Sequence, residues 1–298
     1  MPKLTKFQRE RARGIGGSDA PVICGVARWK SPFQLWVEKT QALEGVAVEE
    51  EDDENPMLLW GTLMEPQILK QFGKRTGRRM IKTTGIVVHP DIDWLIAHLD
   101  GTQHDKALGF GIVEAKNVSR YVSERWLDEP PVEVQVQSQH YMAATGLEYA
   151  TAVGLVGGHN LVWQDIERNQ NFIDAMLERE DRFWQRVLAD NPPTATAADH
   201  KFLNTLVKPV EAKVIVFDGT GTDLDVELQF VLNEIEKQKT VMGPLEEKKK
   251  DIEAKIKQMI GDAEEAHTPS GQVYTFKEVV VNEAIRKGYA FRKFVRKK

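Results

Sequence analysis

The sequence has almost no cysteine and no long apolar run, and both shortages restrict what the protein can be. Cys24 is the one cysteine among 298 residues, which excludes an internal disulfide framework, a four-cysteine iron–sulfur cluster and a cysteine-rich zinc knuckle. No run of about 18 apolar residues occurs, and the N-terminal stretch lacks the apolar segment of a secretory signal. The seven histidines form no HExxH or HxxxH pair. We therefore expect a cytoplasmic protein that, if it uses metal ions, binds them through oxygen ligands.

The net charge is only −5, but the charges are unevenly distributed. Residues 44–54 contain seven acids and no base, and without this run the chain would carry a net charge of +2. Residues 1–39 contain eight bases against three acids, and residues 286–298 contain seven bases and no acid. Basic ends suit a polyanion such as nucleic acid, although solvated surface explains either segment when it is taken alone.

The apolar patterns predict an α/β core. Helical spacing occurs after Ser31-Pro32, which is a typical helix start, and at 56–73, 132–145 and 169–189. Short strand patterns occur at 85–89, 94–99, 112–115, 149–156 and 160–166. This order predicts a central mixed β-sheet flanked by helices. We expect a core domain at 1–205, with a flexible acidic loop at 44–55.

The composition changes in residues 206–298, which we expect to form an appendage. Two charged segments with helical spacing, 226–242 and 245–260, are separated by Gly243-Pro244 and predict a helical hairpin or a short coiled coil. The β-type runs 272–281 and 289–295 predict a β-hairpin. We interpret the appendage as an interaction arm, and the alternative is a helical hairpin that merely covers the core.

Three residues carry the chemistry that we consider most informative. Glu114 and Lys116 share one face of a predicted strand, and Asp100 ends the strand before it. If these two strands pair as a hairpin, two carboxylates and one amine meet at one edge of the sheet. Carboxylates are ligands that Mg²⁺ prefers. A nearby lysine can hold or deprotonate a metal-activated water, and we expect burial to lower the pKa of Lys116 toward the range that this role needs. An Asp-Gly turn and a solvated Glu-Lys pair are the ordinary alternatives.

Other residues extend this group. The glycine-rich segment 14–19 follows Arg11 and Arg13, and such loops can place backbone N–H groups and arginine side chains against phosphate. Glu65 lies on a predicted helix and could supply a third carboxylate, and Gln137 lies on the helix after the Glu-x-Lys strand. Each of these features alone is also common in a turn or on a helix surface.

In this order, six motifs resemble the YqaJ-type viral recombinases, which are relatives of the lambda phage exonuclease in the PD-(D/E)xK nuclease superfamily. The motifs are RxxGIGGSD at 11–19, GxxxE at 61–65, LDG at 99–101, VEAK at 113–116, QxQHYMAxTG at 137–146 and FW at 183–184. The resemblance covers residues 11–193. It implies the PD-(D/E)xK nuclease fold for the core.

The resemblance also implies roles for particular residues. By this resemblance, Asp100, Glu114 and the carbonyl of Ala115 would hold Mg²⁺, with two ions in the family's pattern and Mn²⁺ as a substitute. Lys116 would activate or position the attacking water, and Glu65 and Gln137 would complete the active site. Arg11 and Ser18 match the positions that hold the 5′-phosphate of a DNA end.

The implied function is a 5′→3′ exonuclease on linear double-stranded DNA. It would leave 3′ single-stranded tails for an annealing protein in phage-type recombination. We expect this reaction in the cytoplasm of a bacterial host. Related enzymes can form rings around the DNA, so the resemblance also allows a homo-oligomer. The alternatives are an endonuclease of the same superfamily, a DNA-binding recombination module whose site has decayed, and a structural interaction protein built on the C-terminal helices. The intact Asp100, Glu114 and Lys116 favour the enzyme over the decayed module.

Overall fold

A computed structural model describes residues 6–46, 56–81, 83, 85–126, 128–206, 219–260, 263–269, 272–281 and 289–296. The chain divides into two compact units, Met1–Pro209 and Val210–Lys298. Of the predicted acidic loop at 44–55, residues 47–55 lie outside the described ranges. Within those ranges no helix combines the length and the apolar character that crossing a membrane requires.

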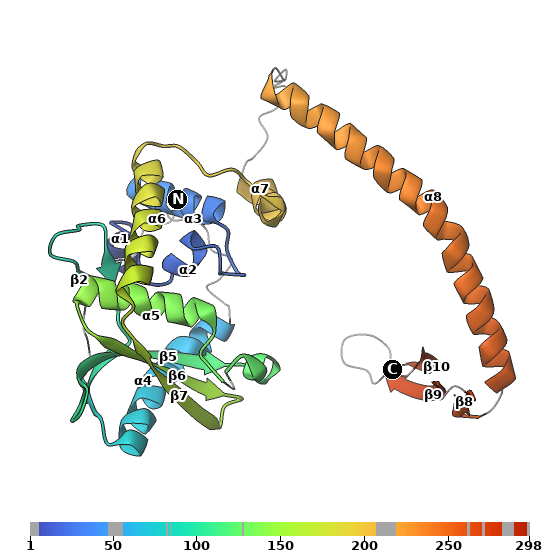
Figure 1. The fold of residues 1–298 in the computed structure, drawn as a ribbon, viewed down its shortest axis with the longest axis horizontal. Helices are drawn as coiled ribbons and strands as arrows, with labels where there is room; N and C mark the ends of the chain where they lie inside the picture. Colours follow the sequence, from blue (N-terminus) through green and yellow to red (C-terminus); the bar gives the residue numbers. More distant parts are fainter. Residues whose placement is uncertain are drawn as a thin grey trace. The chain divides into compact units, whose positions relative to one another are not determined.

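A five-stranded mixed β-sheet forms the centre of the first unit (Figure 1). In spatial order its strands are β1 (Arg79–Ile81), β4 (Gly101–Asp105), β5 (Gly109–Val118), β6 (Tyr149–Val156) and β7 (Asn160–Glu167). Strands β5 and β6 run parallel, and the other neighbouring pairs are antiparallel. The predicted mixed central sheet is therefore confirmed.

Helices cover both faces of this sheet. Helix α4 (Pro56–Thr76) packs on the face that carries Val113, whereas α5 (Val132–Thr145) and α6 (Gln170–Leu188) belong to the core on the face that carries Ile112. Successive side chains of β5 point to opposite faces, so every second residue of this strand lies on the α5 side. This alternation determines which functional side chains of β5 can meet α5.

Local signals set the ends of several helices. Ser31 precedes α3 (Pro32–Leu43), and its hydroxyl accepts a hydrogen bond of 3.0 Å from the Gln34 N–H, as a helix N-cap does. Gly146 ends α5 with a φ of 72°, which favours glycine. The remaining short helices of this unit are α1 (Lys6–Arg11), α2 (Ala20–Ile23), η1 (Arg120–Trp126), η2 (Ala197–Asp199) and α7 (His200–Leu206).

The glycine-rich loop is fixed to a second, two-stranded sheet made of β2 (Val87–Val88) and β3 (Ile96–Ala97). The Ile15 N–H donates a hydrogen bond of 2.7 Å to the carbonyl oxygen of Trp94. A Cβ atom on Gly14 would lie 2.1 Å from that oxygen, so only glycine permits this approach. The loop is thus held close to the strand that leads to Asp100.

The predicted hairpin between 94–99 and 112–115 is wrong. Strand β3 pairs with β2, and the antiparallel partner of β5 is β4, with Gly101 opposite Val113. The segment between Asp100 and Glu114 therefore contains a whole strand, a turn and the first half of β5. Its sequence, Gly-Thr-Gln-His-Asp in β4, has no apolar alternation that could predict a strand.

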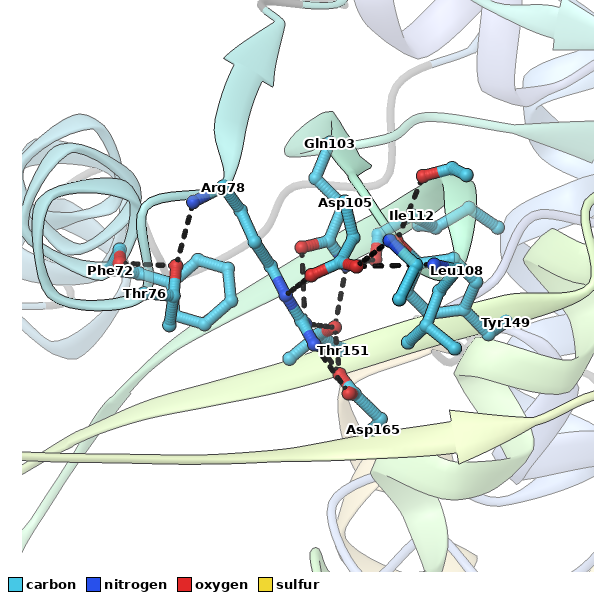
Figure 2. Close-up of polar contacts among 12 residues, drawn as sticks. Phe72, Thr76, Arg78, Gln103, Asp105, Leu108, Ile112, Tyr149, Thr151 and Asp165 are labelled. Carbon is cyan, nitrogen blue, oxygen red and sulfur yellow. Dashed lines mark hydrogen bonds and ion pairs between the residues drawn. The ribbon is translucent and has the colours of Figure 1, made fainter.

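A polar cluster around Arg78 joins strands β4, β6 and β7 of the sheet (Figure 2). The guanidinium donates to both carboxylate oxygens of Asp165 on β7, at 2.7 and 2.6 Å, and at 2.9 Å to Asp105 at the end of β4. It also donates to the Thr151 hydroxyl on β6 at 3.0 Å, and Gln103 on β4 donates to the same hydroxyl at 2.5 Å. Arg78 thus fixes the register of β4, the strand that starts directly after Asp100.

The second unit consists of one long helix and a small sheet. Helix α8 (Thr220–Ile260) is continuous, so the predicted helical hairpin is wrong. Pro244 lies inside this helix, where it removes one hydrogen bond, and the helix bends along its length instead of ending (Figure 1). The predicted β-hairpin is confirmed: β9 (Val273–Val281) pairs with β10 (Tyr289–Arg296), and β8 (Glu265–His267) extends the sheet.

Candidate active site

Strand β5 places Glu114 and Lys116 on the same face, as the alternation predicts. The Lys116 ammonium forms an ion pair with Glu114 Oε1, and Glu114 is only 1% exposed. The side chain of Lys116 is 36% exposed and therefore reaches from the buried carboxylate toward solvent. A solvated surface pair, the ordinary alternative for a Glu-x-Lys pattern, does not describe a glutamate that is buried to this degree.

Asp100 joins this pair from the residue before β4. Because Gly101 lies opposite Val113, Asp100 reaches the next residues of β5, and its Oδ2 accepts a hydrogen bond of 2.8 Å from the Ala115 N–H. Burial and the nearby charge of Glu114 raise the pKa of Asp100 well above its ordinary value, although Lys116 acts in the opposite direction. Two carboxylates are thus held together with one ammonium between β4 and β5.

The donor set fits a divalent cation. Glu114 Oε2 is buried and has no hydrogen-bond partner among the described residues, and Asp100, whose pKa is raised by burial and by the charge of Glu114, would be favoured in its ionised form by a further positive charge. A hard cation that takes oxygen ligands satisfies both conditions. In the described part of the chain, no three acidic, histidine or cysteine side chains already stand in a metal-binding arrangement. Asp100 and Glu114 are thus the two carboxylates that could hold such a cation, and water would complete the ligand set.

Lys116 is held by neighbours on two elements. Its ammonium donates a hydrogen bond of 3.2 Å to Gln137 Oε1 on α5, and the Gln137 amide donates one of 2.7 Å to the Tyr141 hydroxyl. Burial lowers the pKa of Lys116, as the sequence predicted, but the charges of Glu114 and Asp100 outweigh burial and raise the pKa above its ordinary value. The expectation of a lowered pKa is therefore wrong for the metal-free site.

Glu65 lies on α4, close enough for its charge to contribute to the raised pKa values of Asp100 and Lys116. Its effect on both is smaller than that of burial and of the charges within the Asp100, Glu114 and Lys116 group. The structure thus brings together four of the five predicted side chains, Asp100, Glu114, Lys116 and Gln137, and Glu65 acts on them through its charge.

A cavity of about 170 Å³ lies between the glycine-rich loop and Asp100. Its lining includes Arg11 and Ser18 from the loop segment together with Asp100 and Tyr141. Gly17 also lines it, and a Cβ atom there would lie 2.3 Å from the Tyr141 ring. Arg11, Ser18 and Asp100, which are far apart in the sequence, therefore line one cavity.

Charged residues beneath the loop hold Arg11 in place. Arg11 donates a hydrogen bond of 2.7 Å to the Ser18 hydroxyl and lies 3.4 Å from Asp19 Oδ1. Asp19 is 3% exposed and Lys39, on α3, is 5% exposed, and their charged atoms lie 2.6 Å apart. Burial alone raises the pKa of Asp19, but Lys39, Arg11 and the Gly16 N–H hold it well below its ordinary value.

Sequence reasoning did not identify Asp19 and Lys39 as a buried pair, and it missed Tyr141. Lys39 looks like an ordinary charged residue of a helix surface, and nothing local relates it to a residue twenty positions earlier. Tyr141 lies one helical turn after Gln137, and that spacing is the signal that could have placed both side chains in the site.

Comparison with known proteins identifies the family. The model of the YqaJ-like viral recombinase domain matches residues 6–148. The uncharacterized protein YqaJ of Bacillus subtilis (strain 168) is 33% identical over 262 residues, which are 86% of this chain and 77% of that protein. The chain belongs to the YqaJ-like viral recombinase family. The predicted family resemblance is thus confirmed.

The fold of this chain is similar to that of solved exonuclease structures. An alkaline exonuclease from Laribacter hongkongensis, LHK-Exo, superposes with a TM-score of 0.52 at 20% identity, covering 67% of this chain and 98% of LHK-Exo. The structure of LHK-Exo in complex with dAMP gives a TM-score of 0.53, also at 20% identity, over 67% of this chain and 97% of LHK-Exo. At this identity the similarity confirms the predicted exonuclease-type fold.

Proposed function

We propose that this YqaJ-like protein is a Mg²⁺-dependent 5′→3′ exonuclease that acts on linear double-stranded DNA. The observation that carries this proposal is the cavity that Arg11, Ser18 and Asp100 line together. An anion-binding group beside a cation-binding group is the arrangement that hydrolysis of a terminal phosphodiester needs. The similar fold of the alkaline exonuclease LHK-Exo supports exonuclease activity in general.

Asp100, Glu114 and the Ala115 carbonyl are the residues that would hold Mg²⁺, with Mn²⁺ as a substitute and two ions as the full complement. The bound cation lowers the pKa of a water molecule and neutralises charge that develops on the phosphate. Asp100 is oriented for this task by the Ala115 N–H, and Glu114 presents the buried Oε2 that has no other partner among the described residues. Glu65 adds negative charge to the same site.

Lys116 acts in this proposal mainly as a protonated side chain. Because nearby carboxylates raise its pKa, the ammonium is available to orient the attacking water and to stabilise charge on the phosphate oxygens. Gln137 accepts a hydrogen bond from this ammonium and is itself fixed by Tyr141, so these two residues position Lys116.

Arg11 and Ser18 would bind the 5′-phosphate of the DNA end, and this binding would give the enzyme its polarity. Arginine forms strong, charge-assisted hydrogen bonds with phosphate, and a serine hydroxyl adds one donor. The 3.4 Å contact with Asp19 and the bond to Ser18 hold the guanidinium at the cavity before DNA arrives. Such preorganisation reduces the entropy lost on binding.

Arg11→Ala tests this role, with Arg13→Ala as the matched control because Arg13 is exposed and does not line the cavity. Loss of charge-assisted bonds to phosphate costs about 1.5–3 kcal/mol, so Arg11→Ala should slow digestion of 5′-phosphorylated ends roughly 10- to 100-fold. Digestion of 5′-hydroxyl ends should change much less. Equal rates of the wild-type enzyme on both kinds of end would contradict the assignment of Arg11.

The 3′ single-stranded tails that this reaction leaves are substrates for a strand-annealing protein. We propose such a protein as the partner in phage-type recombination, in the cytoplasm of a bacterial host, and this agrees with the name of the family. A homo-oligomeric ring around DNA belongs to the same proposal. The C-terminal unit is proposed as the interaction arm.

A further inference from the structure

Helix α8 carries an apolar face that the proposed nuclease activity does not use. Leu228, Val231, Ile235, Met242 and Leu245 are between 44% and 57% exposed. Three of them line a groove of about 450 Å³ that runs along the helix between residues 230 and 246. An exposed apolar surface that is this continuous marks an interface.

The apolar residues of this face follow a heptad repeat, with alternating spacings of three and four residues, which is the pattern of a coiled coil. We call this face the seam. One series of the seam is Leu228, Ile235, Met242, Lys249 and Ile256, and the other is Leu224, Val231, Gln238, Leu245, Ile252 and Met259. Gly243 and Pro244 belong to neither series and lie on the outward side of the helix, so the proline does not interrupt the seam.

We infer that α8 pairs with α8 of a second copy of this chain as an antiparallel, two-fold symmetric coiled coil. The two-fold axis would pass beside Gly243-Pro244. The seam contains two polar residues, Gln238 and Lys249, and only the antiparallel arrangement places these two opposite each other. Each apolar seam residue from Leu228 to Met259 then meets an apolar residue of the second copy: Leu228 with Met259, Val231 with Ile256, Ile235 with Ile252, and Met242 with Leu245.

A parallel pair is disfavoured by the same residues. It would place Lys249 opposite Lys249 of the second copy inside the seam, and two like charges that lose water there repel each other. It would also pair Gln238 with itself instead of with a lysine. A polar residue at a seam position commonly determines the orientation and register of a coiled coil in this way.

The charges beside the seam complement each other in the antiparallel arrangement. Along one flank, Glu227 and Glu234 precede the axis, and Lys248 and Lys255 follow it. Glu227 then faces Lys255 of the second copy, and Glu234 faces Lys248. The one pair of like charges is Glu246 and Glu246 of the second copy, beside the two-fold axis. Exposed pairs of this kind contribute more to orientation than to affinity.

The mass of the full-length protein in solution tests the pairing. In sedimentation equilibrium, Met242→Asp with Leu245→Asp should halve the assembly mass, because these residues face each other across the seam. The matched control is Val226→Asp with Ala254→Asp, which places the same charges on the outward side of α8 and should leave the mass unchanged. A wild-type mass of one chain at tens of micromolar, or no mass change in the seam variant, would overturn the inference.

Orientation is tested by exchanging charges. Glu227→Lys with Glu234→Lys should weaken the assembly on the order of tenfold, and adding Lys248→Glu with Lys255→Glu should restore it. In a parallel pair, Glu234 would face Lys239 of the second copy, and the second exchange could not restore this contact. Continued weakening in the combined variant would therefore overturn the antiparallel arrangement.

A distance between spin labels measures the orientation directly. One label at Glu227→Cys, in a Cys24→Ser background, should lie roughly 50 Å from the label of the second copy, since position 227 is level with Ile260 of the second copy in this register, 33 residues along the helix from that copy's own label at about 1.5 Å per residue. A parallel pair places the two labels side by side, and a short distance would contradict the inference. None of these measurements depends on nuclease activity, so they and the proposed function fail independently.

Discussion

Lys39 is the buried support of the glycine-rich loop, and its replacement tests whether this loop is held as described. Its ammonium lies 2.6 Å from Asp19 Oδ2 and donates hydrogen bonds to the carbonyl oxygens of Arg11, at 2.9 Å, and Gly14, at 2.6 Å. Lys39→Met preserves the length of the side chain and its apolar stem but removes the charge and all three contacts. Asp19 then stays buried without its main partner.

Removal of one member of a buried ion pair costs about 3–5 kcal/mol, because the remaining charge is neither solvated nor compensated. Asp19 keeps the Gly16 N–H at 2.9 Å and the Arg11 guanidinium at 3.4 Å. We therefore expect Lys39→Met to lower the free energy of unfolding by about 3 kcal/mol, the lower end of that range. Arg11 should also turn toward Asp19 and away from Ser18, which would weaken the preference for 5′-phosphorylated ends.

The ion pair of Asp19 makes the stability of the fold fall at low pH. The pKa of Asp19 is lowered in the folded protein, so its ionised form stabilises the fold above the unfolded pKa of about 4, and this stability is lost as the pH falls below it. Lys39→Met removes the largest favourable charge beside Asp19. The fall in stability below about pH 4 should therefore be shallower in the variant than in the wild type.

Urea unfolding followed by tryptophan fluorescence measures this effect in the first unit, because all seven tryptophans lie between Trp29 and Trp184. Lys30→Met is the matched control: Lys30 pairs with Glu38 at 2.5 Å, but its side chain is 26% exposed. Its loss should cost less than about 1 kcal/mol. Equal effects of the two substitutions, or a loss below about 1 kcal/mol for Lys39→Met, would refute the reasoning.

Three further substitutions have expected outcomes. Arg78→Met should lower the free energy of unfolding by about 1–3 kcal/mol in the same urea assay, because it removes the charge-assisted hydrogen bonds to two partly exposed carboxylates. Gly17→Ala should cost about 1–3 kcal/mol and slow DNA cleavage, since its Cβ would overlap the Tyr141 ring. Asp100→Asn should abolish cleavage. It should also raise the melting temperature of the metal-free protein at neutral pH, because it removes a buried charge that Glu114 repels. A lowered melting temperature would contradict the repulsion between Asp100 and Glu114.

The elements with strong local signals could be predicted from the sequence. The range 132–145 coincides with α5, which Gly146 ends, and 149–156 coincides with β6, whose apolar run is buried along nearly its whole length. The placement of Glu114 and Lys116 on one face followed from strand alternation alone. These features depend on residues that are close together in the chain.

The elements that depend on distant partners could not be predicted in this way. Strand β4 has a polar sequence, and its pairing with β5 and the Arg78 cluster make it a strand. Lys39 becomes a buried residue only because the fold brings Asp19 beneath the glycine-rich loop. Helix α8 continues through Pro244 although a proline after a glycine usually indicates a break, because a proline costs one hydrogen bond and a bend and does not forbid the helix.

Digestion of an end-labelled linear duplex tests the central claim most directly. The wild-type enzyme with Mg²⁺ should degrade only the strands that end in a 5′-phosphate at each terminus, and a closed circular duplex should stay intact. EDTA and Lys116→Ala should each abolish the reaction, with the fold of Lys116→Ala unchanged by circular dichroism. Cutting of the circle would indicate an endonuclease, and DNA binding without any cutting would indicate a binding module; either result would contradict the proposed exonuclease.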